Sequence, residues 1–224
     1  MLFVHLAATM VFDPTFVSDE ARSDIPNDCI YPPEYEGHFE SLMLTREEIL
    51  NKVKLLADTI HEDYKGKRPV MVCVLKGANS FYQHLLEALQ ELKHGYTTEF
   101  LRVSSYEGVH SSGDVQIHGG LDYEALKGRD VILVEDIVDT GTTLSKVIPI
   151  LQEKCQPKSI EVCSLLEKRL EHPPKIKANY IGFLIPNHFI IGYGMDYNEM
   201  YRDLRDIWVI SKKGIDFDQS TLYD

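Results

Sequence analysis

The stretch Val131-Ile-Leu-Val-Glu-Asp-Ile-Val-Asp-Thr-Gly-Thr-Thr-Leu144 decides the fold and locates the candidate site. An apolar run ends at two adjacent acids, Glu135 and Asp136, and after Asp139 a threonine- and glycine-rich turn leads into a helical pattern. This order predicts a buried strand with an acidic edge at its carboxyl end, followed by a turn that opens a helix. Free N–H groups at such a helix start bind phosphate. Because acids cannot bind a phosphate, we expect Glu135 and Asp136 to serve sugar hydroxyls or a magnesium ion beside it.

Strand-like and helix-like patterns alternate on both sides of this stretch. Short, largely apolar runs typical of strands occur at residues 70–75, 97–103, 160–166, 180–184 and 207–210. Helical patterns occur at residues 49–60, 81–92 and from 144 onward, and Thr45 with Glu48 forms a capping box before the first of them. This alternation predicts an α/β fold, a mostly parallel twisted sheet flanked by helices. Such sheets bind ligands at the carboxyl ends of their strands, beside the switch in strand order.

Composition limits the classes of function. The 224 residues carry a formal net charge of 23 − 35 = −12, so nucleic-acid binding, which requires a basic face, is not expected. None of the four cysteines has CxxC or Cys/His spacing, and Cys73 and Cys163 lie in apolar runs. We expect buried thiols and a reducing, cytoplasmic compartment. The apolar residues 1–12 lack a basic start and are too short to span a membrane, so a docked or frayed arm is expected.

Five motifs in a fixed order resemble hypoxanthine-guanine phosphoribosyltransferases, a family of type I phosphoribosyltransferases. They are the opening stretch, Val74-Leu-Lys-Gly77, Ser105-Tyr106, Leu165-Leu-Glu-Lys-Arg169 and Gly192-Tyr-Gly-Met-Asp-Tyr-Asn-Glu-Met-Tyr-Arg-Asp-Leu204. The match is continuous over about 69–210 and weaker over 25–64. The resemblance implies purine salvage, in which hypoxanthine or guanine takes the 5-phosphoribosyl group of phosphoribosyl pyrophosphate to form IMP or GMP and pyrophosphate. It also implies Mg²⁺ as cofactor and a homodimer or homotetramer.

The resemblance implies a role for each residue of the opening stretch. Glu135 and Asp136 accept hydrogen bonds from the ribose hydroxyls, and their charge stabilises a cation that develops on the sugar. Asp139 is the implied general acid or base at purine N7. The residues implied to hold the 5-phosphate are Asp139, Thr140, Gly141, Thr142 and Thr143.

The other motifs supply the remaining contacts that the resemblance implies. The residues for pyrophosphate are Lys76, Gly77, Ser105, Tyr106 and Arg202. The residues for the base are Lys168, Phe189, Ile190 and Asp196. The metal ligands are Glu135, Asp136 and Asp196. The Lys168 ammonium donates to purine O6 and therefore disfavours an aminopurine. Residues 104–114 are implied to form a lid, and the peptide between Leu75 and Lys76 is often cis in this family.

Two positions depart from the family pattern. Many relatives have lysine where Thr142 stands, and a second glycine or serine where Ala78 stands. We expect residues 1–40 to form an N-terminal arm or hood segment, 41–211 the core with a base-binding hood from about 168–205, and 212–224 a C-terminal tail. Two alternatives stay open: a broader enzyme that also accepts xanthine, and a non-catalytic nucleotide sensor of the same fold. The sensor is disfavoured because Lys76 and Asp139 are both present.

Overall fold

A twisted seven-stranded sheet with the strand order β1-β8-β7-β6-β3-β4-β5 forms the body of the molecule. The computed structural model describes residues 13–22, 29–105, 115–118, 120–218 and 220. The strands of this sheet are β1 (Thr15–Phe16), β3 (Val70–Leu75), β4 (Thr97–Ser105), β5 (Val115–His118), β6 (Asp130–Val138), β7 (Ser159–Lys168) and β8 (Tyr180–Ile185). All pairings are parallel except that of β5 with β4. The predicted α/β class is therefore confirmed.

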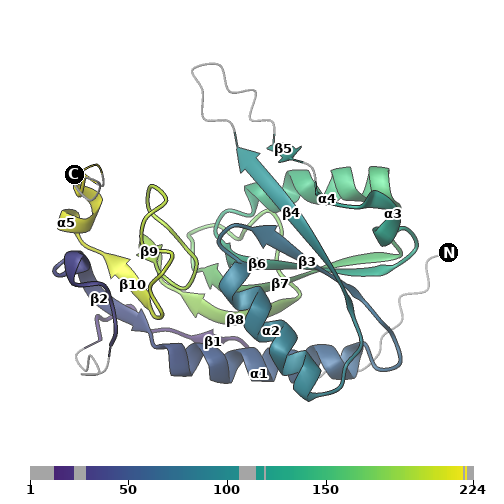
Figure 1. The fold of residues 1–224 in the computed structure, drawn as a ribbon, viewed down its shortest axis with the longest axis horizontal. Helices are drawn as coiled ribbons and strands as arrows, with labels where there is room; N and C mark the ends of the chain where they lie inside the picture. Colours follow the sequence, from purple (N-terminus) through teal and green to yellow (C-terminus); the bar gives the residue numbers. More distant parts are fainter. Residues whose placement is uncertain (1–12, 23–28, 106–114, 119, 219, 221–224) are drawn as a thin grey trace.

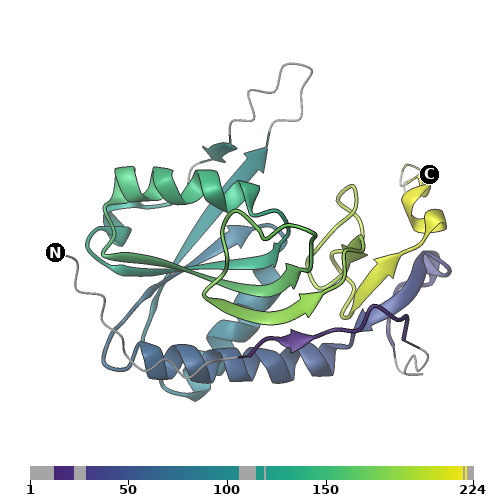
Figure 2. The same ribbon diagram turned by 180° about the vertical axis from the view of Figure 1, so that it is seen from behind.

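Helices cover both faces of this sheet (Figures 1 and 2). On one face lie α1 (Arg46–Asp63) and α2 (Asn79–Glu91), and on the other lie α3 (Tyr123–Leu126) and α4 (Thr142–Cys155). Two apolar cores result, one under each helical layer. Strands with both faces covered must be apolar throughout, which accounts for the unbroken apolar runs of β3 and β6. Pro149 lies inside α4, and the helix continues through it.

A second, three-stranded antiparallel sheet lies at one end of the body, and we call it the hood. Its strands β2 (Phe39–Leu44), β10 (Ile207–Ile210) and β9 (Ile190–Ile191) follow the order β2-β10-β9. The segment η1 (Pro33–Tyr35) and α5 (Lys212–Ile215) lie beside it, at the left of Figure 1. The alternation of strands and helices predicts that residues 207–210 belong to the mostly parallel sheet, and this prediction is wrong, because they form the antiparallel strand β10. Its apolar pattern predicts a strand, but the pattern does not name the strand's partners.

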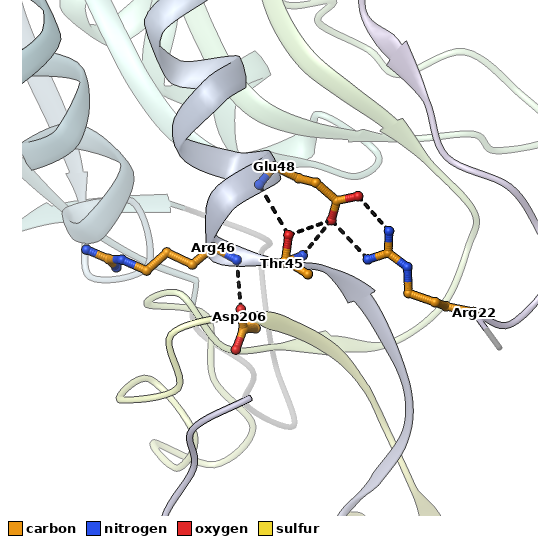
Figure 3. A network of polar contacts seen from close by, with 5 residues as sticks. All are labelled: Arg22, Thr45, Arg46, Glu48 and Asp206. Carbon is orange, nitrogen blue, oxygen red and sulfur yellow. Dashed lines mark hydrogen bonds and ion pairs between the residues drawn. The ribbon is translucent and has the colours of Figure 1, made fainter. Parts of the chain in front are cut away.

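The predicted capping box at the start of α1 is present. The Thr45 hydroxyl accepts from the Glu48 N–H at 3.2 Å, and the Glu48 carboxylate accepts from the Thr45 N–H at 2.8 Å. Figure 3 shows two further contacts at this point: the guanidinium of Arg22 donates to Glu48, and Asp206 accepts from the Arg46 N–H at 2.7 Å. The start of α1 thus joins the N-terminal arm, the body and the hood.

The cysteines behave as small apolar side chains. No disulfide joins the four cysteines, all of which lie in the described part of the chain, and Cys73 and Cys163 are buried in β3 and β7. Within the described residues, no helix is both long and apolar enough to cross a membrane.

Candidate functional site

The switch in strand order places two loops of the predicted site together. Strand β3 leads to β4 on one side and β6 leads to β7 on the other, so the carboxyl ends of β3 and β6 flank the crevice where ligands of such sheets bind. The Leu75–Lys76 peptide that follows β3 is cis, as expected. A Cβ on Gly77 would lie 1.7 Å from Oδ2 of Asp136. A side chain at this position would force the Asp136 carboxylate to move, because this carboxylate of β6 packs directly on the loop after β3.

The two adjacent acids of β6 are buried in an environment that disfavours their charge. Burial, together with the neighbouring Asp136, raises the pKa of Glu135 well above its ordinary value. One oxygen of Glu135, Oε2, has no hydrogen-bond partner among the described residues. Burial also raises the pKa of Asp136 to about 6, although it accepts the Ile137 N–H at 2.8 Å and Arg202 opposes the shift. Buried carboxylates with open lone pairs suit a ligand that brings hydroxyl donors or a cation.

The turn after β6 leads into α4 without a side-chain cap. Gly141, at φ +69°, is the N-cap of α4 and supplies no side-chain cap, so the first-turn N–H groups of the helix are left for a ligand. Thr140 and Thr142 exchange a hydroxyl hydrogen bond at 3.0 Å. From behind, the Lys175 N–H donates to the Thr140 carbonyl at 2.9 Å, and a Cβ on Gly141 would lie 2.8 Å from the Ile176 nitrogen. The turn is therefore held in an anion-binding shape.

The structure brings Asp139 and Lys168 together across 29 residues of sequence. Nζ of Lys168, at the end of β7, lies 3.0 Å from Oδ2 of Asp139. The lysine side chain is 12% exposed and the aspartate 48% exposed. A donor and an acceptor thus stand side by side next to the phosphate turn. Such a pair can read two neighbouring polar atoms of a planar ligand.

The loop of residues 192–204 supplies the other cation of the site. Arg202 donates to Asp196 at 2.8 Å and to the Gly194 carbonyl at 2.8 Å. Lys76 donates to Glu199 at 2.8 Å, and Arg202 approaches the same carboxylate at 3.4 Å. Hydrogen bonds from Lys76 and then Arg202 lower the pKa of Glu199. Glu199 was missed from the sequence, although it lies within a motif that was singled out. It occupies the place between two cations where an anionic ligand is expected.

The hood supplies two of the remaining predicted residues, Phe189 and Ile190, and the others lie on α4, on β4 and in the lid. Phe189 precedes β9 and is 52% exposed, with its ring edge-on to Tyr197 at a centroid distance of 5.4 Å. Ile190 is buried in β9, where it pairs with Val209 of β10. Thr143 lies in the first turn of α4. The Ser105 backbone ends β4, while its side chain, the whole of Tyr106 and the lid residues 106–114 lie outside the described part of the chain.

The described residues contain no group of three His, Cys, Asp or Glu side chains that could hold a metal ion by itself. Asp196 is close enough to Asp136 to raise its pKa slightly, but Asp196 is paired with Arg202. The three predicted metal ligands are thus near one another without forming a protein-only cage. Any metal ion held by these carboxylates would therefore need further oxygen ligands from water or from a bound ligand.

The fold and this site define a class. Residues 43–198 match the family model of the phosphoribosyl transferase domain. Within that class, the chain belongs to the hypoxanthine-guanine phosphoribosyltransferase family. It is 35% identical over 213 residues to the hypoxanthine-guanine phosphoribosyltransferase of Canis lupus familiaris, a match that covers 92% of this chain and 97% of the relative. The enzyme of Homo sapiens is 35% identical over 202 residues, which cover 88% and 92% of the two chains.

A solved structure supports the same assignment. The crystal structure of a hypoxanthine phosphoribosyltransferase from Staphylococcus aureus superposes with a TM-score of 0.74 at 34% identity. The superposition covers 84% of this chain and all of the other. The fold class and the resemblance predicted from the sequence are both confirmed.

Proposed function

We propose that this chain transfers the 5-phosphoribosyl group of phosphoribosyl pyrophosphate to hypoxanthine or guanine, forming IMP or GMP and releasing pyrophosphate. The observation that carries the proposal is the contact of Lys168 with Asp139 beside the phosphate turn. The family resemblance implies the reaction, and this pair supplies the donor and the acceptor that would recognise the base. Both residues lie at the edge of the crevice that the switch in strand order creates.

The base is read by a donor and an acceptor. A 6-oxopurine offers an acceptor at O6 and, next to it, N7, where a proton must be gained or lost. The Lys168 ammonium donates to O6, and the Asp139 carboxylate exchanges the proton at N7. Adenine would set its amino donor against the ammonium donor and leave both unpaired, which is costly in a partly buried site. Phe189 stacks on the base, and Ile190 contacts its edge through backbone groups.

The sugar and its charge are held by the acids of β6. Glu135 and Asp136 accept hydrogen bonds from the ribose hydroxyls, and ionised carboxylates favour the positive charge that develops at C1 as pyrophosphate leaves. Burial raises both pKa values in the ligand-free chain. A cation or hydroxyl donors in the crevice favour the ionised forms again, so the carboxyl groups of Glu135 and Asp136 ionise when the ligand binds.

The same carboxylates, with Asp196, are the proposed contacts of Mg²⁺. The donor set consists of hard oxygen atoms, one of them buried without a partner, and these properties fit the ion. When bound, Mg²⁺ would neutralise charge on the pyrophosphate and orient it. Glu135, Asp136 and Asp196 would hold it, directly or through water.

The two phosphate groups are proposed to occupy different ends of the crevice. The α4 N–H groups with Asp139, Thr140, Gly141, Thr142 and Thr143 hold the 5-phosphate. Thr142 brings no positive charge, so N–H groups and hydroxyls carry this contact alone. Lys76, Gly77 and Arg202 hold the pyrophosphate, with Ser105 and Tyr106 added from the lid. Glu199 occupies both cations in the ligand-free chain, and the pyrophosphate must displace it.

The test of the function is identification of the product. Purified chain with Mg²⁺, phosphoribosyl pyrophosphate and hypoxanthine or guanine should release pyrophosphate and form IMP or GMP, detected by chromatography. Absence of turnover with any purine would refute the proposal. Competition with xanthine in the same assay decides whether the broader 6-oxopurine specificity applies.

Assembly and location complete the proposal. We propose a homodimer or homotetramer, in keeping with the family resemblance, and a cytoplasmic location, which the unlinked thiols support. Light scattering after size exclusion measures the mass directly against the 25.6 kDa chain. A monomer at micromolar concentration would contradict the assembly part alone.

A further inference from the structure

A histidine outside the site contacts it through one tyrosine. His84 of α2 lies between Arg46 of α1 and Tyr193 of the loop 192–204. Its Nδ1 lies 2.7 Å from the Tyr193 hydroxyl, and its Nε2 lies 3.0 Å from the Arg46 guanidinium. The rings of His84 and Tyr193 stack at a centroid distance of 5.6 Å and an interplanar angle of 16°. The Tyr193 side chain is buried, which fixes this pair in place.

The partners determine the tautomer of His84. A guanidinium can only donate, so Nε2 of His84 must accept from Arg46 and carries no proton. The neutral ring therefore bears its proton on Nδ1, which donates to Tyr193, and the Ser80 carbonyl in the preceding turn accepts from the same ring. Arg46 itself is fixed from the other side, because Asp206 accepts its backbone N–H. Figure 3 shows the Arg46 side chain directed away from that contact.

Tyr193 lies where the loop 192–204 meets the loop after β3, which carries the proposed pyrophosphate contacts Lys76 and Gly77. Its N–H donates to the Leu204 carbonyl at 2.8 Å, and the next N–H, of Gly194, donates to the Arg202 carbonyl at 3.1 Å. A Cβ on Gly194 would lie 2.3 Å from the Gly77 carbonyl oxygen. A shift of Tyr193 therefore moves both Gly77 and Arg202, the two sides of the proposed pyrophosphate site.

We propose that His84, in its Nδ1-protonated neutral form, is a positioning residue that acts through Tyr193 to hold Gly77 and Arg202 in place for pyrophosphate. The proposal rests on the proposed function of the site. It assigns a role to a histidine that has no metal-ligand spacing and does not touch the substrate. The role is specific for the phosphoribosyl pyrophosphate side of the reaction and leaves the base side alone.

The charges around His84 make its positioning role, and therefore KM for phosphoribosyl pyrophosphate, dependent on pH. Burial lowers the pKa of His84, the Arg46 guanidinium lowers it further, and Glu87 on the same helix and the Ser80 carbonyl oppose these effects. The residue is therefore neutral at pH 7.5. Protonation below its ordinary value of 6.5 would place a second cation against Arg46 and remove the acceptor at Nε2. The Arg46 contact that holds the ring in place against Tyr193 is then lost as the pH falls.

The test compares four variants with the wild-type chain. Tyr193→Phe removes only the hydroxyl, His84→Leu removes both ring contacts, and His84→Asn keeps an N–H donor toward Tyr193 but does not titrate. Tyr180→Phe is the matched control, since it removes a buried tyrosine hydroxyl that contacts Asp63 and Glu161 far from the site. KM is measured for each substrate at pH 7.5 and 5.5, and the Kd of pyrophosphate with Mg²⁺ by calorimetry.

At pH 7.5, Tyr193→Phe and His84→Leu should raise KM for phosphoribosyl pyrophosphate and Kd for pyrophosphate by about tenfold, with KM for guanine unchanged. His84→Asn and Tyr180→Phe should stay at wild-type values. At pH 5.5 the wild-type KM for phosphoribosyl pyrophosphate should rise by more than that of His84→Asn.

Wild-type constants in Tyr193→Phe and His84→Leu overturn the positioning role, as does an equal rise in KM for guanine. A wild-type chain that turns over no purine refutes the proposed function alone, because pyrophosphate affinity still tests His84. A wild-type chain that binds no pyrophosphate overturns the positioning role too.

Discussion

At the scale of the residue, the site depends on pairs that the sequence holds far apart. Lys168 and Asp139 are 29 residues apart and meet at 3.0 Å. Lys76 and Glu199 are 123 residues apart and meet at 2.8 Å. The first pair joins two residues whose roles the resemblance implied separately. The second joins a predicted cation to an acid that had no predicted role. A sequence pattern names residue types and their order, but contacts between motifs require the fold.

Asp139 is the residue whose loss should affect chemistry and leave binding intact. Asp139→Asn keeps the size and one acceptor but cannot exchange a proton at N7, so kcat should fall by roughly 10²–10⁴-fold. The Kd for IMP or GMP, measured by calorimetry, should change little. Lys158→Met, which breaks a surface pair with Asp130, serves as a variant remote from the site. Full turnover by Asp139→Asn would show that another group moves the proton.

Asp136 should cost stability in the ligand-free chain. Its folded pKa, about 6, lies above the ordinary value of 3.8, so folding is penalised fully above pH 6 and not below pH 3.8. Asp136→Asn should therefore raise the free energy of unfolding by roughly 1–3 kcal/mol at pH 8 and lose that gain near pH 4, while turnover falls. Urea unfolding at the two pH values measures this. The exposed Asp58→Asn of α1 is the control, and an equal effect in both variants would contradict the burial of Asp136 as the cause.

At the scale of the element, local signals predicted best where one short motif fixes the geometry. The capping box of α1 is present at the predicted Thr45 and Glu48. Strand β3 covers the predicted residues 70–75. Strand β6 continues past its apolar run to Val138, because parallel pairing with β7 includes Glu135 and continues at Ile137 and Val138. Backbone pairing does not depend on side-chain polarity, so the hydrophobic pattern predicted a strand that is too short at its carboxyl end.

Glu48 links the start of α1 to the arm and gives the helix an acid-sensitive contact. Partial burial raises its pKa, but hydrogen bonds from Arg22 and Thr45 outweigh this and lower it to about 2. Because the folded pKa is below the ordinary 4.5, the stabilisation is complete above pH 4.5 and is lost as the pH falls toward 2.

Glu48→Gln should therefore lower the free energy of unfolding by about 1 kcal/mol at pH 7, since solvent screens this half-exposed pair. The difference from wild type should shrink below pH 4.5. Glu47→Gln, an exposed neighbour in the same turn, is the control. Thermal unfolding at pH 7 and pH 3 would contradict the account if Glu48→Gln and Glu47→Gln behaved alike.

At the scale of the whole molecule, two sheets meet where the substrate is proposed to bind. The parallel body holds the residues proposed to bind sugar and phosphate, at the end of β6 and on the loops after β3 and β6. The antiparallel hood holds Phe189 and Ile190 beside β10. Sequence alternation predicted the body because each strand–helix unit is local. It did not predict the antiparallel pairing within the hood, whose strands β2 and β10 are separated by more than 160 residues and pair only in the folded chain.

We propose that Lys168, held against Asp139, selects a 6-oxopurine. The most direct measurement is the ratio of kcat/KM for guanine to kcat/KM for adenine, in the wild-type chain and in Lys168→Met, with the surface variant Lys158→Met as control. A ratio of about 10⁴ or more is expected for the wild-type and control chains, because a site built around a donor strongly rejects the mismatched base. In Lys168→Met the ratio should fall by at least about 100-fold. Comparable rates with adenine and guanine in the wild-type chain, or an unchanged ratio in Lys168→Met, would contradict the claim.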